Sequence, residues 1–190
     1  KKGARLLNSS VGYIAGNHTY NMLTGDSCLM SLAGNLAARK GMLIINSAGN
    51  EGDKDWKMIG FPGDADSVLT VGAIDSKLGV RASYSSYGPT KNLNLKPNVT
   101  AIGDLHWYNG KSLRIIKGTS FSAPLVTGYL ACVLQNQPNL KPIELMDTIQ
   151  KTSSLYPYFD YSHGYGVPRA TLYFNEDTIK GPQASISLLK

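Results

Sequence analysis

Residues 42–52 read Met-Leu-Ile-Ile-Asn-Ser-Ala-Gly-Asn-Glu-Gly (MLIINSAGNEG), and this stretch decides the fold class. Its apolar start, residues 42–45, is the continuous run expected of a strand buried on both faces of a parallel sheet. The run stops at a loop of small and polar residues, 46–52. An amide on such a loop can project into a cleft at the carboxyl end of the strand. We therefore expect an α/β protein with Asn50 in a candidate site.

The apolar pattern around this stretch predicts further strands and helices. Strands are expected at residues 5–10, 68–73 and 112–116, the last of these in a hairpin. Helices are expected at residues 27–40, at residues 121–135, and from Pro142 onward. Strands that alternate with helices imply a parallel sheet with right-handed crossovers.

The three helices differ in the faces that they should bury. The first carries an apolar face and ends at Gly41, and that face consists of Leu29, Leu32, Ala33, Leu36 and Ala37. The helix at residues 121–135 is apolar nearly all round, so it should be central and buried. The third has core spacing at Ile143, Met146 and Ile149.

Length and charge narrow the classes of function. The 190 residues suit one domain or a large part of a bigger one, with a core over residues 4–174 and a tail or following region at 175–190. The net charge of +6 is spread along the chain, so nucleic-acid binding is not expected. No apolar run approaches the roughly 18 residues of a membrane span. Cys28 and Cys132 lie in apolar helical patterns, which favours two buried thiols over a disulfide.

Residues 117–124, Lys-Gly-Thr-Ser-Phe-Ser-Ala-Pro (KGTSFSAP), place Ser120 at the start of an apolar helix. Free N–H groups at a helix start suit an anionic intermediate, and a serine nucleophile also needs an adjacent base. The commoner explanation of such a serine or threonine is an N-cap. Likewise, Asn50 alone could be a turn residue in a left-handed conformation.

Taken together, the two loops resemble the subtilisin-like serine peptidases (subtilases). The remaining matches follow in the order of that family: residues 8–12 (NSSVG), 61–63 (FPG), 71–73 (VGA), 84–89 (YSSYGP), 96–99 (KPNV) and 164–170 (GYGVPRA). The resemblance implies a three-layer α/β fold with a mostly parallel sheet, of which the N-terminal part is absent. The α/β-hydrolase nucleophile elbow fits less well, because Ser122 stands where that motif requires glycine.

The resemblance also implies roles for individual residues. Ser120 is expected to be the acylating nucleophile, and Asn50 the side-chain donor of an oxyanion hole that the Ser120 N–H and the Thr119 hydroxyl complete. Residues Ser10, Val11 and Gly12 are expected to pair with an extended peptide or protein substrate.

Four further residues are expected around the primary specificity pocket. The resemblance implies that Ala48, Gly49 and Gly60 line it and that Gly60 leaves it open to large side chains. Glu51 at its rim would favour basic or polar ones. The Phe61–Pro62 peptide bond is expected to be cis.

The Asp and His of a subtilase triad are missing from the sequence. In the family both precede the strand at residues 5–10, and none of His18, His106 and His163 fits the pattern of the base. We therefore expect the C-terminal part of a serine endopeptidase domain, inactive alone. The alternative is a non-catalytic peptide-binding or scaffold module, and an unrelated serine esterase is a weaker third.

The remaining expectations concern ligands and surroundings. No cofactor or metal is expected. Calcium sites are common in the family, but the acidic residues of this sequence match no known ligand loop. We therefore favour solvated carboxylates at Asp53, Asp55, Asp64 and Asp66. A cut parallel sheet leaves an open edge and an exposed apolar face, so self-association is expected. The family resemblance implies a secreted or cell-envelope location.

Overall fold

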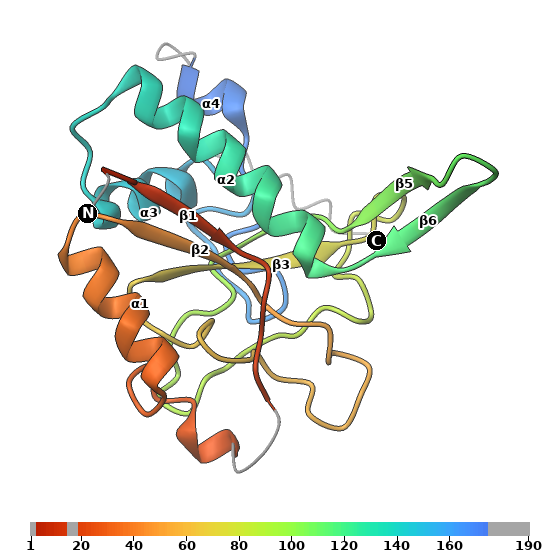
Figure 1. Ribbon diagram of the computed structural model, residues 1–190, viewed down its shortest axis with the longest axis horizontal. Coiled ribbons are helices and arrows are strands. Elements are labelled where there is room, and N and C mark those ends of the chain that lie inside the picture. The colour runs from red at the N-terminus through yellow and green to blue at the C-terminus, as the bar shows by residue number, and fades with distance from the viewer. Residues whose placement is uncertain (1–2, 15–18, 175–190) are drawn as a thin grey trace, which may run out of the picture.

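The protein is built around a four-stranded sheet, which the computed structural model describes together with the rest of residues 3–14 and 19–174 (Figure 1). All neighbouring strands are parallel and follow the chain order: β1 (Leu6–Ser9), β2 (Leu43–Ser47), β3 (Val68–Ile74) and β4 (Val99–Ile102). Every residue of β3 is buried, as the continuous apolar runs predict for a central parallel strand. The predicted parallel sheet is thus confirmed.

Helices cover both faces of the sheet and make three layers. The helices are η1 (Tyr20–Met22), α1 (Leu29–Arg39), α2 (Thr119–Asn136), α3 (Pro142–Lys151) and α4 (Ala170–Phe174). Leu69 belongs to the core that α2 and α3 form with the sheet, and the adjacent Val68 lies against Gly34 of α1. Because successive side chains of a strand point to opposite faces, α1 and the α2–α3 pair lie on opposite sides.

A two-stranded antiparallel hairpin projects from this body (Figure 1). Its strands are β5 (Asp104–Tyr108) and β6 (Leu113–Lys117), and they pair from Asp104 with Lys117 to Tyr108 with Leu113. The predicted hairpin is therefore present, and its second strand leads directly into α2. Among the described residues the only α-helical crossover between neighbouring strands is α1, which joins β1 to β2; the other two connections are loops.

The α1 helix turns its apolar face outward, contrary to our expectation. Leu29, Leu32 and Leu36 are exposed, and the buried residues are Ser31 and Gly34. The Ser31 hydroxyl donates to the buried carboxylate of Asp64 at 2.6 Å. A Cβ on Gly34 would stand 2.6 Å from Val68, so the helix lies too close to the sheet for a larger side chain there. Close backbone approach and one buried hydrogen bond therefore decide which face packs inward.

The α2 helix is buried along one side only, which corrects the prediction of a fully enclosed helix. Val126, Leu130 and Val133 pack in the core, and Leu125 is 57% exposed. Cys132 is also exposed on this helix, whereas Cys28 is buried as predicted. In α3 the prediction fails at one residue, because Ile143 is 68% exposed and the neighbouring Leu145 is buried instead.

Candidate active site

The candidate site lies at the carboxyl edge of the sheet, where the segments that follow β1 and β2 meet the start of α2. Ser10 comes directly after β1, residues 48–52 come directly after β2, and Ser120 is the second residue of α2. Parallel strands end at the same edge, so this topology gathers polar groups that are far apart in sequence. The sheet therefore brings the predicted catalytic and substrate-binding segments together.

Asn50 is fixed by the residue that precedes Ser120. Its side-chain Oδ1 accepts hydrogen bonds from the Thr119 N–H at 2.9 Å and from the Thr119 hydroxyl at 3.0 Å. A backbone N–H can only donate, so the amide atom that faces it must be the oxygen. The Asn50 Nδ2 group is thereby left on the other side of the amide, available to a ligand. Thr119 itself is fully buried and also accepts the Gly49 N–H at 3.2 Å.

Two simpler explanations of these residues do not hold. The N-cap residue of α2 is Gly118, so neither Thr119 nor Ser120 has that role. Gly49 carries the positive φ of the loop, at 110°, and Asn50 is not among the residues with positive φ. A Cβ on Gly49 would also stand 2.8 Å from the Ser86 hydroxyl, so the loop requires glycine there.

Ser120 and Ser10 bind each other through two hydrogen bonds. The Ser120 hydroxyl donates to the Ser10 carbonyl at 3.3 Å, and the Ser10 hydroxyl donates to the Ser120 carbonyl at 3.1 Å. The Ser120 N–H belongs to the first turn of α2, whose amides have no partner within the helix. The field of the helix end is positive at this position. An anion beside Ser120 would therefore meet both a donor and a favourable field.

A cavity of about 120 Å³ joins most of the predicted residues. Its lining residues are Ser10, Gly12, Ile14, Ser47, Gly49, Asn50, Glu51, Gly60 and Ser120. Ile14 and Ser47 are additions that our sequence analysis missed. The alternation of Ser10, Gly12 and Ile14, with a period of two residues, could have indicated Ile14. Val11, which we also predicted to bind substrate, does not line this cavity and is 52% exposed.

Gly60 lines the cavity and is joined through its main chain to Ala48, which we also predicted there but which does not line it. Ala48 is fully buried, and its carbonyl accepts the Gly60 N–H at 3.2 Å. A Cβ on Gly60 would stand 3.2 Å from Ile14, so the segment after β1 lies directly over this glycine and narrows the cavity. Tyr13 and Phe61 exchange two backbone hydrogen bonds beside it, at 3.0 and 3.1 Å. The expected cis Phe61–Pro62 bond is confirmed.

Glu51 lines the cavity, and its carboxylate is paired with a lysine. Lys54 donates to its Oε1 at 3.1 Å, and the Lys54 side chain is 60% exposed. Such an exposed pair contributes only about 0–1 kcal/mol, so a cation in the cavity could compete with Lys54.

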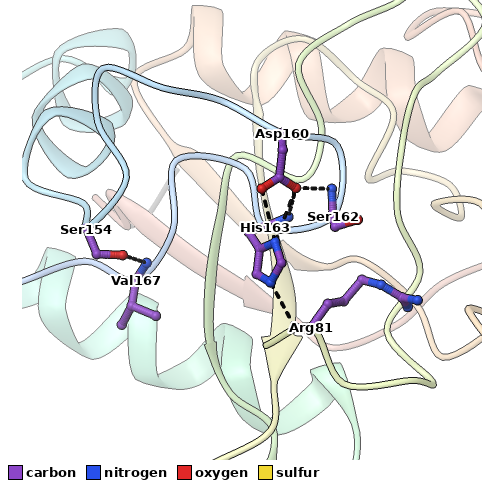
Figure 2. Close-up of polar contacts among 6 residues, drawn as sticks. All are labelled: Arg81, Ser154, Asp160, Ser162, His163 and Val167. Atoms are coloured by element: carbon purple, nitrogen blue, oxygen red, sulfur yellow. Dashed lines mark hydrogen bonds and ion pairs between the residues drawn. The ribbon is translucent and has the colours of Figure 1, made fainter. Parts of the chain in front are cut away.

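Neither described histidine, His106 or His163, hydrogen-bonds to Ser120, whose hydroxyl donates to the Ser10 carbonyl; Figure 2 shows the partners of His163. Both ring nitrogens of His163 are engaged, Nε2 by the Arg81 N–H at 2.8 Å and Nδ1 by Asp160 at 3.1 Å. His106 is exposed on the projecting strand β5, and His18 lies outside the described residues.

The four carboxylates considered for calcium do not form a cluster. Asp64 is fully buried, contrary to the solvated position we expected, and accepts the Ser31 hydroxyl and the Gly25 N–H. Burial raises the pKa of the Asp64 carboxyl, and these hydrogen bonds oppose the shift. Asp66 accepts the Asn94 side-chain amide at 2.6 Å. Within residues 3–14 and 19–174, no group of three or more His, Cys, Asp or Glu side chains could hold a metal ion.

The same described ranges contain no helix that is long and apolar enough to cross a membrane.

Comparison with known proteins agrees with the resemblance inferred from the sequence. The sequence model of the subtilase family matches residues 1–166. The chain is 29% identical to subtilisin DY of Bacillus licheniformis over 166 residues, which are 86% of this chain and 55% of that protein. It is 31% identical to a thermostable alkaline protease of Halalkalibacterium halodurans over 140 residues, 72% of this chain and 37% of that protein.

A solved structure extends the agreement to the fold. A protease of Pseudoalteromonas arctica superposes with a TM-score of 0.63 at 25% identity, covering 92% of this chain and 52% of that one. The chain thus spans 37–55% of the length of these three proteins. From the family match, the parallel sheet and the shared fold, we conclude that this chain belongs to the subtilase family.

Proposed function

We propose that Ser120 is the nucleophile of a serine endopeptidase in the full-length protein. The observation that carries this proposal is the pair of hydrogen bonds from Thr119 to Asn50 Oδ1, which leaves the Asn50 Nδ2 group beside the cavity that Ser120 also lines. A nucleophile and a preorganised amide donor at one cavity are the parts that acyl transfer requires.

The reaction would proceed through an acyl-enzyme. Ser120 Oγ attacks the carbonyl carbon of the scissile peptide bond, and a base accepts the hydroxyl proton. The negative charge on the carbonyl oxygen is stabilised by Asn50 Nδ2 and the Ser120 N–H. The C–N bond then breaks, the proton passes to the leaving amine, and water later hydrolyses the ester. The Thr119 hydroxyl donates to Asn50 Oδ1, so in this scheme it orients the donor and does not itself bind the oxyanion.

The base and its aspartate would come from polypeptide outside residues 1–190. This part of the proposal is supported by the engagement of His163 and by the exposed position of His106. It is also supported by two uncovered surfaces: β1 is an edge strand of the sheet, and Leu125 of α2 is 57% exposed. Residues 1–190 alone should therefore be inactive and should self-associate through these surfaces.

An extended peptide is the substrate class that the cavity wall favours. Residues 10–12 would pair with the substrate main chain, and Gly49, Glu51 and Gly60 would surround one substrate side chain. The carboxylate of Glu51 favours a basic or polar side chain there. Membership of the subtilase family supports a secreted or cell-envelope location, which fractionation of the source cells and medium would test.

A second candidate is a non-catalytic peptide-binding module. The observation that favours it is the Ser120 hydroxyl, which donates to the Ser10 carbonyl and not to a base. Hydrolysis of an unstructured protein substrate by the full-length protein separates the two candidates, with Ser120→Ala as the control. Endopeptidase function predicts cleavage that Ser120→Ala abolishes. Substrate that binds but stays intact would support the binding module.

A further inference from the structure

The loop that carries Asn50 rests on a second loop, residues 82–87. Three hydrogen bonds join the two loops: Ser86 N–H to Gly49 O at 3.0 Å, Glu51 N–H to Ser86 Oγ at 3.1 Å, and Gly52 N–H to Tyr84 O at 2.8 Å. These contacts lie on both sides of Asn50 in the sequence. The position of the Asn50 main chain therefore depends on the second loop.

Arg81 organises this second loop. Its Nη1 donates to three main-chain carbonyls, those of Ala82 at 3.2 Å, Ser83 at 3.0 Å and Ser85 at 2.6 Å. Its guanidinium carbon lies 4.7 Å from the centre of the Tyr87 ring, within the range of a cation–π contact. A Cβ on Gly52 would stand 2.7 Å from Arg81 Nη1 and 2.2 Å from the Ser85 carbonyl, so the guanidinium lies directly against the Asn50 loop.

His163 and Asp160, which lie about 80 residues later in the chain, hold the main chain of Arg81 (Figure 2). His163 Nε2 accepts the Arg81 N–H at 2.8 Å. That nitrogen must be unprotonated, so Nδ1 carries the proton and donates to Asp160 at 3.1 Å. Asp160 is fixed in turn, because its Oδ1 accepts the N–H groups of Ser162 at 2.6 Å and His163 at 2.7 Å.

We infer that His163 is a positioning residue for the oxyanion donor Asn50, acting through Arg81 and the loop at residues 82–87. This inference rests on the proposed peptidase function. His163 uses the pairing of carboxylate and imidazole that orients a general base, but its Nε2 binds a main-chain amide in place of a nucleophile. Its Nε2 is an acceptor for Arg81, so His163 supports the donor of the site and is not its base.

A double-mutant cycle in the full-length protein tests whether His163 acts through Asn50. Relative to wild type, His163→Ala is expected to lower kcat about tenfold with KM changed less than about twofold, because one positioning hydrogen bond is lost. In an Asn50→Ala background the same change should have almost no effect on kcat. His163→Gln, which keeps an acceptor on a side chain of similar reach, should retain most of the activity. Equal losses in both backgrounds would overturn the inference.

A second measurement does not depend on activity. Hydrogen exchange of the Glu51 and Gly52 amides reports the two bonds that tie the Asn50 loop to residues 82–87. His163→Ala should accelerate exchange at both amides, whereas the control His106→Ala, on the exposed hairpin, should not. Unchanged exchange in His163→Ala would contradict the inference even if the protein proves to have no peptidase activity. If the wild type is inactive but His163→Ala accelerates exchange, only the proposed function is contradicted.

Discussion

Asn50 Oδ1 accepts both the backbone N–H and the hydroxyl of Thr119, a residue 69 positions later in the chain. This double contact sets the orientation of the Asn50 amide from the first residue of the helix that carries Ser120. The proposed nucleophile and the proposed oxyanion donor are therefore placed relative to each other by a single intervening residue, Thr119. Substitutions on either side of this contact should change the chemical step more than substrate binding.

Removal of the Asn50 amide should reduce kcat and leave KM nearly unchanged. Asn50→Ala is expected to lower kcat by about 10²–10³-fold, which is the loss that removal of an oxyanion-hole donor causes in subtilisin itself. The effect falls on kcat because the donor binds the charge that develops in the transition state. Steady-state kinetics of the full-length protein measure it. A loss confined to KM would contradict the assigned role.

Removal of the Thr119 hydroxyl should produce a smaller loss of the same kind. Thr119→Val keeps the shape of the side chain but deletes the hydroxyl's hydrogen bonds to Asn50 and Gly49, so only the Thr119 N–H still orients the amide. We expect kcat to fall about threefold to tenfold. The control is Thr119→Ser, which keeps the hydroxyl and should behave like the wild type. Equal losses in the two variants would show that packing, and not the hydroxyl, is responsible.

Lys96 should make stability depend on pH in the alkaline range. Burial lowers the pKa of Lys96 from 10.5 to about 7, and the charges of Asp66 and Asp64 oppose the shift. Between about pH 7 and 10.5 the unfolded chain binds more protons at this site than the folded chain, so the free energy of unfolding should increase with pH. Lys96→Met should flatten this increase in denaturant unfolding measured across the window.

The matched control for Lys96 is Lys151→Met. The Lys151 ammonium is on the surface of α3 and pairs with Asp147 at 2.7 Å. Its removal should leave the pH dependence of the wild type nearly intact. A Lys96→Met variant that keeps the full alkaline increase would refute the assignment of that increase to Lys96.

The uncovered face of α2 should cause residues 1–190 to self-associate when produced alone. Leu125 is 57% exposed on that face. Sedimentation should show a mass that rises with concentration, and Leu125→Lys should reduce the rise. Ile143→Lys changes a side chain that is 68% exposed on α3 and should have little effect. A monomer at high concentration would rule out this surface.

The central strands β2 and β3 can be predicted from the sequence because burial of nearly all their residues leaves an unambiguous apolar run, whereas our sequence analysis did not predict the edge strand β4. It is harder to predict which face of a helix is buried. In α1 the apolar stripe of Leu29, Leu32 and Leu36 is exposed, because the helix is held by the hydrogen bond from Ser31 to Asp64 and by the close approach of Gly34 to the sheet. Periodicity identifies an apolar face, but it does not say what lies beside that face.

In the candidate site, too, some residues can be predicted from the sequence and others cannot. Ser120 and Asn50 can be proposed from their motifs, because a serine or an amide in a short glycine-containing loop leaves a local pattern, whereas Gly60 is expected only from the family resemblance. The link between His163 and Arg81 spans 82 residues and depends on one ring nitrogen and one main-chain amide. No local pattern marks such a contact, since either residue alone reads as an ordinary loop residue.

The most direct test of the central claim is labelling with a fluorophosphonate, which reacts with an activated serine. Incubation of the full-length protein should add one label, which peptide mass spectrometry should locate on Ser120, and Ser120→Ala should remain unlabelled. Residues 1–190 alone should also remain unlabelled, because we propose that the base lies outside them. Full-length protein that cleaves peptides yet carries no label on Ser120, or carries it on another serine, would contradict the account.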